Sequence, residues 1–443
     1  MTPRLRRGVL LVALLGVAAC APPPPKGNVI LVSIDCLNAR QFAHALSSGT
    51  MPTLAAVARE SLVFTRAYAH APWTTPAHMS MLTGLYPSQH GRDVPPPLQQ
   101  RLVATYDRVP TFRSLADRLG TAGFETVAFV GQGSISGIFG LAQGFRRYRE
   151  SPKRTEAQDL RSTRQAIVRW LARRPPGPFF LFLHTYDLHT PRPASYTTED
   201  RALRGIDSGL GLILRELRER GLYDSALVIV TGDHGSAMKA GQKCCTHGAG
   251  HYEENLRVPL LVRLPNGGTP GESDRVVAHV DIVPTVLDVL GLRADDYAGP
   301  GVSVLRTLRA DPAPARLSYS EADAYCARRH ALVDARFKYI YTPVDTEGWL
   351  LNRLSLFHLD CPATCKTLPR EEFFDLTRDP DEDHELIAGG MDEEQARALA
   401  SYRSAMEQHL NLAPQYRRAI EPPRDFRLDP DVQRALKALG YVQ

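Results

Sequence analysis

The sequence predicts an α/β fold with a mostly parallel central sheet between helices, followed by a smaller C-terminal unit of antiparallel strands and a helix. Short, continuous apolar runs recur along the first two thirds of the chain, and such runs are typical of buried parallel strands. Helical patterns separate these runs, as in βαβ units. After about residue 310 the apolar segments become shorter and alternate with polar residues, which favours an antiparallel sheet.

The predicted strands of the main sheet cover residues 28–35, 126–130, 179–184, 226–233 and 258–264. The predicted helices between them cover residues 53–61, 111–119, 158–172 and 202–220. Ligands of such sheets bind beyond the carboxyl ends of the strands. Two strands end in acidic residues, Asp35 and Asp233, and a third leads into Asp187. We expect these three polar clusters to converge on one edge of the sheet.

The C-terminal unit is predicted from alternating segments at 317–321, 331–341 and 373–376, followed by a helical pattern over 393–410. We expect a small antiparallel sheet and a helix packed beside the main domain. The boundary between the two units is placed at residues 310 and 311.

The N-terminus has the features of an export signal. Arg4, Arg6 and Arg7 precede an uncharged run over 9–19. That run is shorter than the roughly 20 apolar residues that a membrane-spanning helix requires. The string Val17-Ala18-Ala19-Cys20 resembles the bacterial lipobox, in which the cysteine is lipidated and becomes the first residue. We expect a signal peptide over 1–20 and a stiff, proline-rich tether over 21–27.

The expected location is therefore the bacterial cell envelope, with a lipid on Cys20 holding the protein to a membrane so that it faces the periplasm or the exterior. The alternative is an ordinary signal peptide cut near Ala19, which leaves a soluble protein. A net charge of +5 includes the three arginines of the signal, and no basic run with interleaved aromatic residues occurs, so nucleic acid is not an expected partner. Oligomeric state cannot be read from the sequence.

Seven cysteines are present, and six remain when Cys20 is set aside: Cys36, Cys244, Cys245, Cys326, Cys361 and Cys365. An even number in an exported protein permits disulfides, and the most local candidate pair is Cys361 with Cys365. The sequence does not reveal the pairing. The paired CxxC spacing of zinc fingers is absent.

Asp35, Asp233 and His234 offer two carboxylates and an imidazole at the ends of two predicted strands. Divalent cations favour carboxylate oxygens, and imidazole suits zinc or manganese. Taken singly, an aspartate after a strand often caps the next helix, and an Asp-His-Gly turn is common. Together the three residues favour a metal site.

The segment 71–84 predicts a helix that starts with Thr75 as N-cap and Pro76 at the first helical position, and that ends at Gly84. The hydroxyl of Thr74 would lie at the positive end of this helix, where an anionic ester also binds favourably. A threonine hydroxyl is a weak nucleophile and needs a metal to bring it toward the alkoxide.

Residues 74–91 resemble the signature of the sulfatase family, a branch of the alkaline-phosphatase superfamily, in which a Cys or Ser opens the motif and is oxidised to formylglycine. Further segments similar to family motifs are 28–35, 230–235, 247–262, 277–292, 338–341, 374–380 and 436–442. The resemblance implies an alkaline-phosphatase-like fold and metal-dependent ester hydrolysis by a catalytic domain at 28–310, with a C-terminal subdomain at 311–443. It also implies one divalent ion (manganese, zinc or calcium) on Asp35, Thr74, Asp233 and His234.

Several residues depart from the signature. Thr74 stands at the formylglycine position and cannot be oxidised to that aldehyde, while Ala77 and His78 replace its Ser and Arg. Cys36 stands where the family often carries a second acid, and His234 is the residue of phosphate-processing relatives. These departures favour phosphate esters over sulfate esters, although sulfate-ester hydrolysis remains an alternative.

Asp187 to Pro191 resemble a family segment whose histidine contacts the ester or protonates the leaving group, which makes His189 a candidate acid. His247 matches a family position that binds the ester or a second metal. A loop histidine without a role is the alternative for His189. The short Asp-x-His spacing at Asp187 differs from that of two-zinc phosphodiesterases, so we expect one metal, with a second possible. We also expect substrate contacts from His78, Asp187 and Lys243, whereas His184 and His251 are weaker candidates.

The expected reaction is a ping-pong hydrolysis in which Thr74 attacks the ester and His189 or His247 protonates the departing alcohol. The substrate would be a small-molecule, glycan or lipid ester. A transferase acting on envelope glycans or lipids and a non-catalytic binding lipoprotein are the alternatives.

Overall fold

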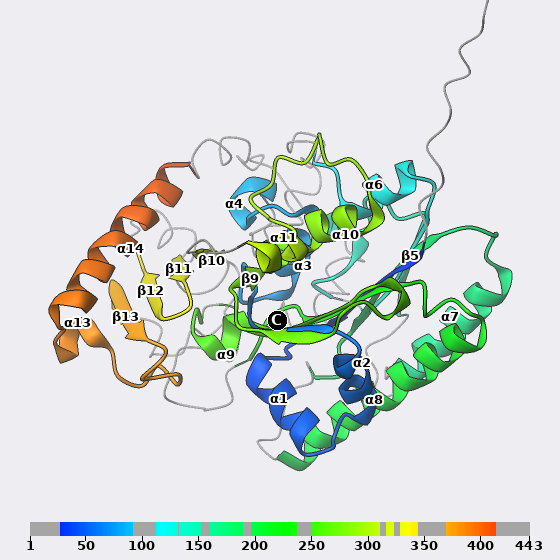
Figure 1. The fold of residues 1–443 in the computed structure, drawn as a ribbon, viewed down its shortest axis with the longest axis horizontal. Helices are drawn as coiled ribbons and strands as arrows, with labels where there is room; N and C mark the ends of the chain where they lie inside the picture. The colour runs from blue at the N-terminus through cyan, green and yellow to red at the C-terminus, as the bar shows by residue number, and fades with distance from the viewer. Residues whose placement is uncertain are drawn as a thin grey trace, which may run out of the picture.

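The computed structural model describes residues 27–91, 112–131, 133–151, 160–188, 196–236, 248, 250–310, 316–322, 328–343 and 369–412. Within these ranges the chain forms a nine-stranded sheet with helices on both faces and a separate four-stranded sheet (Figure 1). Among the described residues, none of the helices combines the length and apolar character needed to cross a membrane.

The main sheet has the strand order β4-β3-β5-β1-β6-β7-β2-β8, with β9 beside β2. Its strands are β1 Val29–Ile34, β2 Leu62–Tyr68, β3 Glu125–Val130, β4 Arg147–Glu150, β5 Phe179–Thr185, β6 Leu227–Gly232, β7 Arg257–Arg263, β8 Gly271–Ser273 and β9 Val277–Ala278. The five strands from β4 to β6 are parallel, whereas β7 runs antiparallel to both β6 and β2. The apolar run at 258–264 was predicted as a parallel strand. It does not distinguish the two directions, because a strand covered on both faces is apolar in either case.

Two layers of helices cover the sheet (Figure 1). One face carries α1 Ala39–Ser47, α2 Pro52–Arg59, α7 Leu160–Arg173 and α8 Tyr196–Glu219. The other carries α3 Thr74–Thr83, α6 Leu115–Thr121, α10 Ile282–Leu290 and α11 Val304–Arg309. In β1, Val29 and Leu31 join the core beneath α3, and Ile30, Val32 and Ile34 join the opposite core, which explains why the strand is apolar on both faces.

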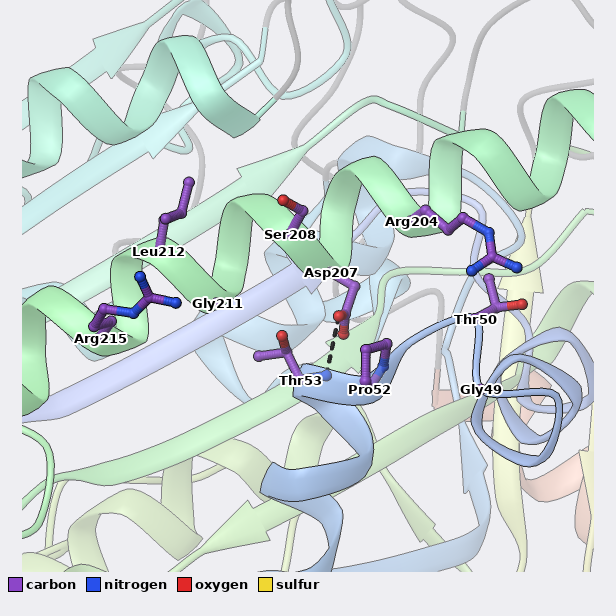
Figure 2. Close-up of a pocket in the computed structure, with 10 residues that line it drawn as sticks. All are labelled: Gly49, Thr50, Pro52, Thr53, Arg204, Asp207, Ser208, Gly211, Leu212 and Arg215. Carbon is purple, nitrogen blue, oxygen red and sulfur yellow. Dashed lines mark hydrogen bonds between the residues drawn. The ribbon is translucent and has the colours of Figure 1, made fainter.

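A groove of about 430 Å³ lies between α2 and α8, on the face of the sheet opposite α3 (Figure 2). Asp207 of α8 reaches across it and accepts hydrogen bonds from the backbone N–H groups of Thr53 (3.0 Å) and Leu54 (2.8 Å). This carboxylate therefore caps α2, whose own N-cap residue, Met51, has no side-chain acceptor. None of the residues lining the groove is a predicted site residue, so we interpret it as structural.

The small sheet is antiparallel, as predicted, and has the order β10-β11-β12-β13. Its strands are β10 Ser318–Ala322, β11 Arg329–Val333, β12 Phe337–Tyr341 and β13 Glu371–Asp375, and two helices follow, α13 Leu386–Gly389 and α14 Glu393–Leu412. The predicted segment 331–341 is a hairpin of two strands. Asp334 makes its turn by accepting the backbone N–H groups of Arg336 and Phe337, both at 2.7 Å.

Buried polar contacts join the two sheets. Lys338 of β12 is fully buried and pairs with Glu253 (2.7 Å) and Glu382 (3.1 Å). Glu253 begins α9 Glu253–Leu256, which leads into β7. His70, after β2, donates from Nδ1 to the carbonyl of Tyr319 in β10 (2.5 Å) and accepts the N–H of Val280 at Nε2 (3.3 Å). The segment leading to α3 is therefore fixed against the small sheet.

Burial lowers the pKa of His70 to about 3. The unfolded chain therefore binds a second proton on this ring more tightly than the folded protein does. The stability that the neutral His70 ring contributes is fully present above the unfolded pKa of about 6.5 and is lost as the pH falls toward 3. We expect the free energy of unfolding of the wild type to fall more steeply than that of His70→Asn, by about 1.4 kcal/mol per pH unit in this window. Urea unfolding of both proteins between pH 7 and about pH 4 measures the difference, and equal slopes would contradict the expectation.

Candidate active site

Two aspartates lie side by side at the carboxyl edge of the main sheet. Ile34 of β1 is paired with Gly232 of β6, so Asp35 and Asp233 follow directly after matched positions of neighbouring strands. Both side chains are fully buried. Burial, and then the charge of Asp35, raise the pKa of Asp233 well above its usual value. Two adjacent carboxylates without solvent are unfavourable as ions unless a cation accompanies them.

The carboxylate of Asp233 is held in one orientation. Its Oδ1 accepts the backbone N–H groups of His234 (2.8 Å) and Cys36 (3.1 Å). Cys36 adopts a left-handed conformation with φ of 61°, which costs a non-glycine residue roughly 1 kcal/mol and here turns its N–H toward the aspartate. No hydrogen bond to Oδ2 is found within the described part of the chain. This oxygen lies 3.4 Å from Nε2 of His234.

The imidazole of His234 has a defined tautomer. Its Nδ1 lies 2.8 Å from the carbonyl oxygen of Gly235, which can only accept, so Nδ1 carries the proton. The lone pair of Nε2 therefore faces the oxygen of Thr74 at 3.4 Å. A backbone carbonyl that fixes the second nitrogen in this way is a common feature of metal-binding histidines. Donor atoms of Asp35, Cys36 and His234 lie within 4.8 Å of one another.

Thr74 is the first residue of α3, with Trp73 in extended conformation before it, and Gly84 ends the helix at a φ of 72°. The hydroxyl of Thr74 donates to Oδ2 of Asp35 at 3.2 Å. The prediction that Thr75 caps this helix is wrong. Its hydroxyl donates to the carbonyl of Ser134 (2.5 Å), and this tertiary contact replaces the cap. The helix start therefore brings the hydroxyl of Thr74, and not that of Thr75, to Asp35 and His234.

Residues 27–292 match the Sulfatase family model. The chain belongs to the sulfatase family. Human arylsulfatase A is 23% identical over 448 residues, an alignment that covers 86% of this chain and 87% of that protein. The solved structure of BT1596, a 2-O GAG sulfatase, superimposes with a TM-score of 0.67 at 17% identity and covers 92% of this chain and 96% of its own. Phosphonate monoester hydrolase of Agrobacterium radiobacter superimposes with a TM-score of 0.62 at 20% identity, covering 88% and 96%.

These comparisons confirm the predicted family and the alkaline-phosphatase-like fold, and they identify the chain as a sulfatase-family ester hydrolase. Enzymes of this family generally depend on a metal. The residues at the strand ends fit a divalent cation: two buried carboxylates, one of them with an oxygen that no described residue hydrogen-bonds, and an imidazole whose lone pair points at the same place.

The other predicted residues of this sulfatase-family site have different placements. Asp187 accepts the hydroxyl of Thr185 (2.5 Å) and the N–H of Leu160 (3.3 Å), contacts that direct Oδ2 toward the start of α7. His189, Lys243 and His247 lie outside the described residues, as do Cys20, Cys244, Cys245, Cys326, Cys361 and Cys365. Cys36 is buried and forms no disulfide within the described part of the chain.

Two histidines lie deeper in the site. Nε2 of His184 is 3.5 Å from Oδ2 of Asp35, so this weaker candidate does contact the site. His78 is fully buried beneath Thr74, with its Nδ1 2.8 Å from the carbonyl oxygen of Thr74 and 3.6 Å from Oδ2 of Asp233. Burial, and then His184, lower the pKa of His78 well below its usual value.

Sequence reasoning missed Ser33, whose Oγ lies 2.9 Å from Nε2 of His78. The available signal was a single hydroxyl near the end of an otherwise apolar strand, two residues before the acid Asp35.

Proposed function

We propose that this sulfatase-family protein hydrolyses phosphate esters through a covalent intermediate on Thr74, with one divalent cation held by Asp35, Thr74, Asp233 and His234. The observation that carries the proposal is the position of the Thr74 hydroxyl. It lies at the N-terminus of a buried helix, 3.2 Å from Oδ2 of Asp35 and 3.4 Å from the unprotonated nitrogen of His234. A hydroxyl held beside a base and a candidate cation site is the arrangement that nucleophilic catalysis needs.

The protein's own groups supply the first step. Asp35 is the hydrogen-bond acceptor of the Thr74 hydroxyl, so the proton leaves the nucleophile in its direction. The oxygen of Thr74 then forms a bond to phosphorus as the bond to the departing alcohol breaks. When bound, a divalent cation would neutralise charge on the ester and favour the deprotonated hydroxyl. The N-terminal end of α3 adds favourable dipole charge toward the anionic ester.

The departing alkoxide needs a proton, and we propose His189 or His247 as its donor, with Asp187 and Lys243 contacting the substrate. Water then attacks the phosphothreonine, which releases phosphate, and the proton held by Asp35 returns to the oxygen of Thr74. The same histidine, now neutral, accepts the proton of that water. Atoms and charges therefore balance over the two halves of the reaction.

Phosphate is preferred over sulfate in this proposal because Thr74 cannot form formylglycine. A structural neighbour of similar fold acts on phosphonate monoesters, which supports phosphorus chemistry on this framework. Sulfate-ester hydrolysis is the second candidate, because arylsulfatase A aligns over most of its length.

We also propose that the protein is an exported lipoprotein of the bacterial envelope, anchored through Cys20 after removal of a signal peptide. Its parts would be a tether over 21–27, a catalytic domain over 28–310 and a C-terminal subdomain over 311–443. A Cys20→Ala variant that stays in the membrane fraction would contradict the anchor.

Metal content and ester turnover of the purified chain test the proposed function together. We expect a divalent metal in near-equal amount to protein, and faster turnover of p-nitrophenyl phosphate or bis(p-nitrophenyl) phosphate than of p-nitrophenyl sulfate. Removal of the metal with a chelator should lower turnover by about a thousandfold or more, since a bound cation supplies several kcal/mol to such reactions. Added manganese, zinc or calcium should restore it. Sulfate turnover above phosphate turnover would favour the second candidate, and activity that survives metal removal would contradict the cation.

A further inference from the structure

A row of polar side chains crosses three strands beneath α3. Ser33 of β1 is paired in register with His184 of β5 on one side and with Thr231 of β6 on the other. All three are buried. The preceding positions on the same face, such as Leu31, Phe182 and Ile229, belong to the apolar core. A buried polar row is unfavourable unless it is hydrogen-bonded, and here Thr231 donates to the carbonyl of Pro259 (2.7 Å) whereas Ser33 bonds to a side chain of α3.

His78 connects this row to Thr74. Its Nδ1 lies 2.8 Å from the carbonyl oxygen of Thr74, which can only accept, so Nδ1 is the protonated nitrogen. In the neutral ring Nε2 is then an acceptor, and the Ser33 hydroxyl donates to it at 2.9 Å. The ring packs edge-on against His184, with centroids 4.9 Å apart, and this contact limits its rotation.

The donor atoms of His78, His184 and Asp233 also lie within 4.8 Å of one another, a distance that could accommodate a second cation. We do not assign one there, because both nitrogens of His78 already take part in hydrogen bonds. These bonds give His78 a different task.

We propose that Ser33 and His78 are positioning residues, which keep the Thr74 hydroxyl within hydrogen-bond distance of Asp35. They do so through two hydrogen bonds: the Ser33 hydroxyl donates to Nε2 of His78, and Nδ1–H of His78 donates to the Thr74 carbonyl. Ser33 lies in β1, and Asp35 follows directly after that strand ends at Ile34, two residues after Ser33. The proposed nucleophile, Thr74, and the carboxylate that accepts its proton, Asp35, are thereby both positioned by the segment that contains β1. The inference rests on the proposed role of Thr74 and deepens it.

The test compares four variants with wild type in the full chain. His78→Leu removes both hydrogen bonds, whereas His78→Asn keeps a donor near the position of Nδ1. Ser33→Ala removes only the link to the strand. Ser80→Ala is the matched control, because Ser80 lies on the same helix as His78, away from Thr74, and forms a similar buried contact with His90 (3.2 Å).

The readouts are kcat and KM for bis(p-nitrophenyl) phosphate, bound metal and melting temperature. We expect kcat of His78→Leu to fall about 100-fold with KM within about threefold of wild type, because small displacements of a reacting group cost about that much. We expect His78→Asn to recover kcat to within about fivefold of wild type and Ser33→Ala to lose about tenfold. Ser80→Ala should melt earlier at unchanged kcat.

Unchanged kcat in a folded, metal-loaded His78→Leu protein would overturn the positioning role, and so would a His78→Asn protein as slow as His78→Leu. An equal fall of kcat in Ser80→Ala would also overturn it, since any buried Ser–His contact would then suffice. Thr74→Ala distinguishes failure of the positioning role from failure of the proposed function. If it is inactive while His78→Leu is unaffected, only the positioning role fails. If Thr74→Ala keeps wild-type turnover, the proposed function itself fails.

Discussion

Thr74→Ala is expected to lower kcat for phosphate esters by about a thousandfold or more, because the variant lacks the oxygen that would bond to phosphorus. Thr74→Ser keeps that oxygen and should retain turnover within about a hundredfold of wild type, the loss reflecting a less constrained hydroxyl. Steady-state kinetics of the three proteins at saturating metal measure both effects.

A matched control exists on the same helix. Thr83 is buried at the far end of α3, and its hydroxyl donates to the carbonyl of Met79 (2.6 Å). Thr83→Ala should cost some stability and leave kcat unchanged. Rapid acid quenching of the wild type, followed by peptide mass analysis, should detect phosphate on Thr74. Full activity in Thr74→Ala, or phosphate on another residue, would contradict the nucleophile.

Asp233→Asn is expected to abolish metal binding and to lower kcat/KM by about a thousandfold or more, because it removes one of the two negative charges at the strand ends. The amide oxygen can still accept the backbone N–H groups of Cys36 and His234, so the local fold should persist. Metal analysis and kinetics of the purified variant test both expectations.

The same substitution, which is expected to lower activity, is expected to raise the stability of the metal-free protein. In metal-free protein, we expect Asp233→Asn to melt at a higher temperature than wild type at neutral pH, because it removes a buried negative charge and its repulsion with Asp35. Asp207→Asn is the control: this buried carboxylate caps α2 in the groove of Figure 2, so its loss should destabilise the protein while metal binding and kcat remain. A metal-loaded, active Asp233→Asn protein would contradict the assignment of Asp233.

Much of the fold followed from local pattern, and the exceptions have physical causes. The five apolar runs are all strands, since continuous apolar character is required of a strand covered on both faces. β2 was not predicted because Thr65 and Arg66 interrupt its apolar pattern and lie half-buried near the edge of the sheet. α1 was also missed, although Asn38 and Gln41 form a capping box that a search for helix starts could have found.

The convergence of Asp35, Asp233 and His234 was predictable, because residues that follow neighbouring parallel strands meet at one edge, whereas the place of Thr74 was predicted from the resemblance to the sulfatase signature. The depth of His78 was not predictable. Its ring folds back over the first turn of α3, and this direction depends on Ser33, a partner 45 residues earlier in the chain.

The pairing of Ile34 with Gly232 has a consequence for how such a protein changes over time. The spacing between the two aspartates is set by the hydrogen-bonded ladder of β1 and β6, and not by the segments that follow β5 and β6 in the sequence. Those segments, 189–195 and 237–247, contain His189, Lys243 and His247, which are proposed to protonate the departing alcohol or to contact the ester. Exchange of either segment with that of a relative is therefore expected to alter which ester is accepted while the cation affinity stays the same. Under the proposed roles, substrate choice and metal binding can therefore change independently of each other.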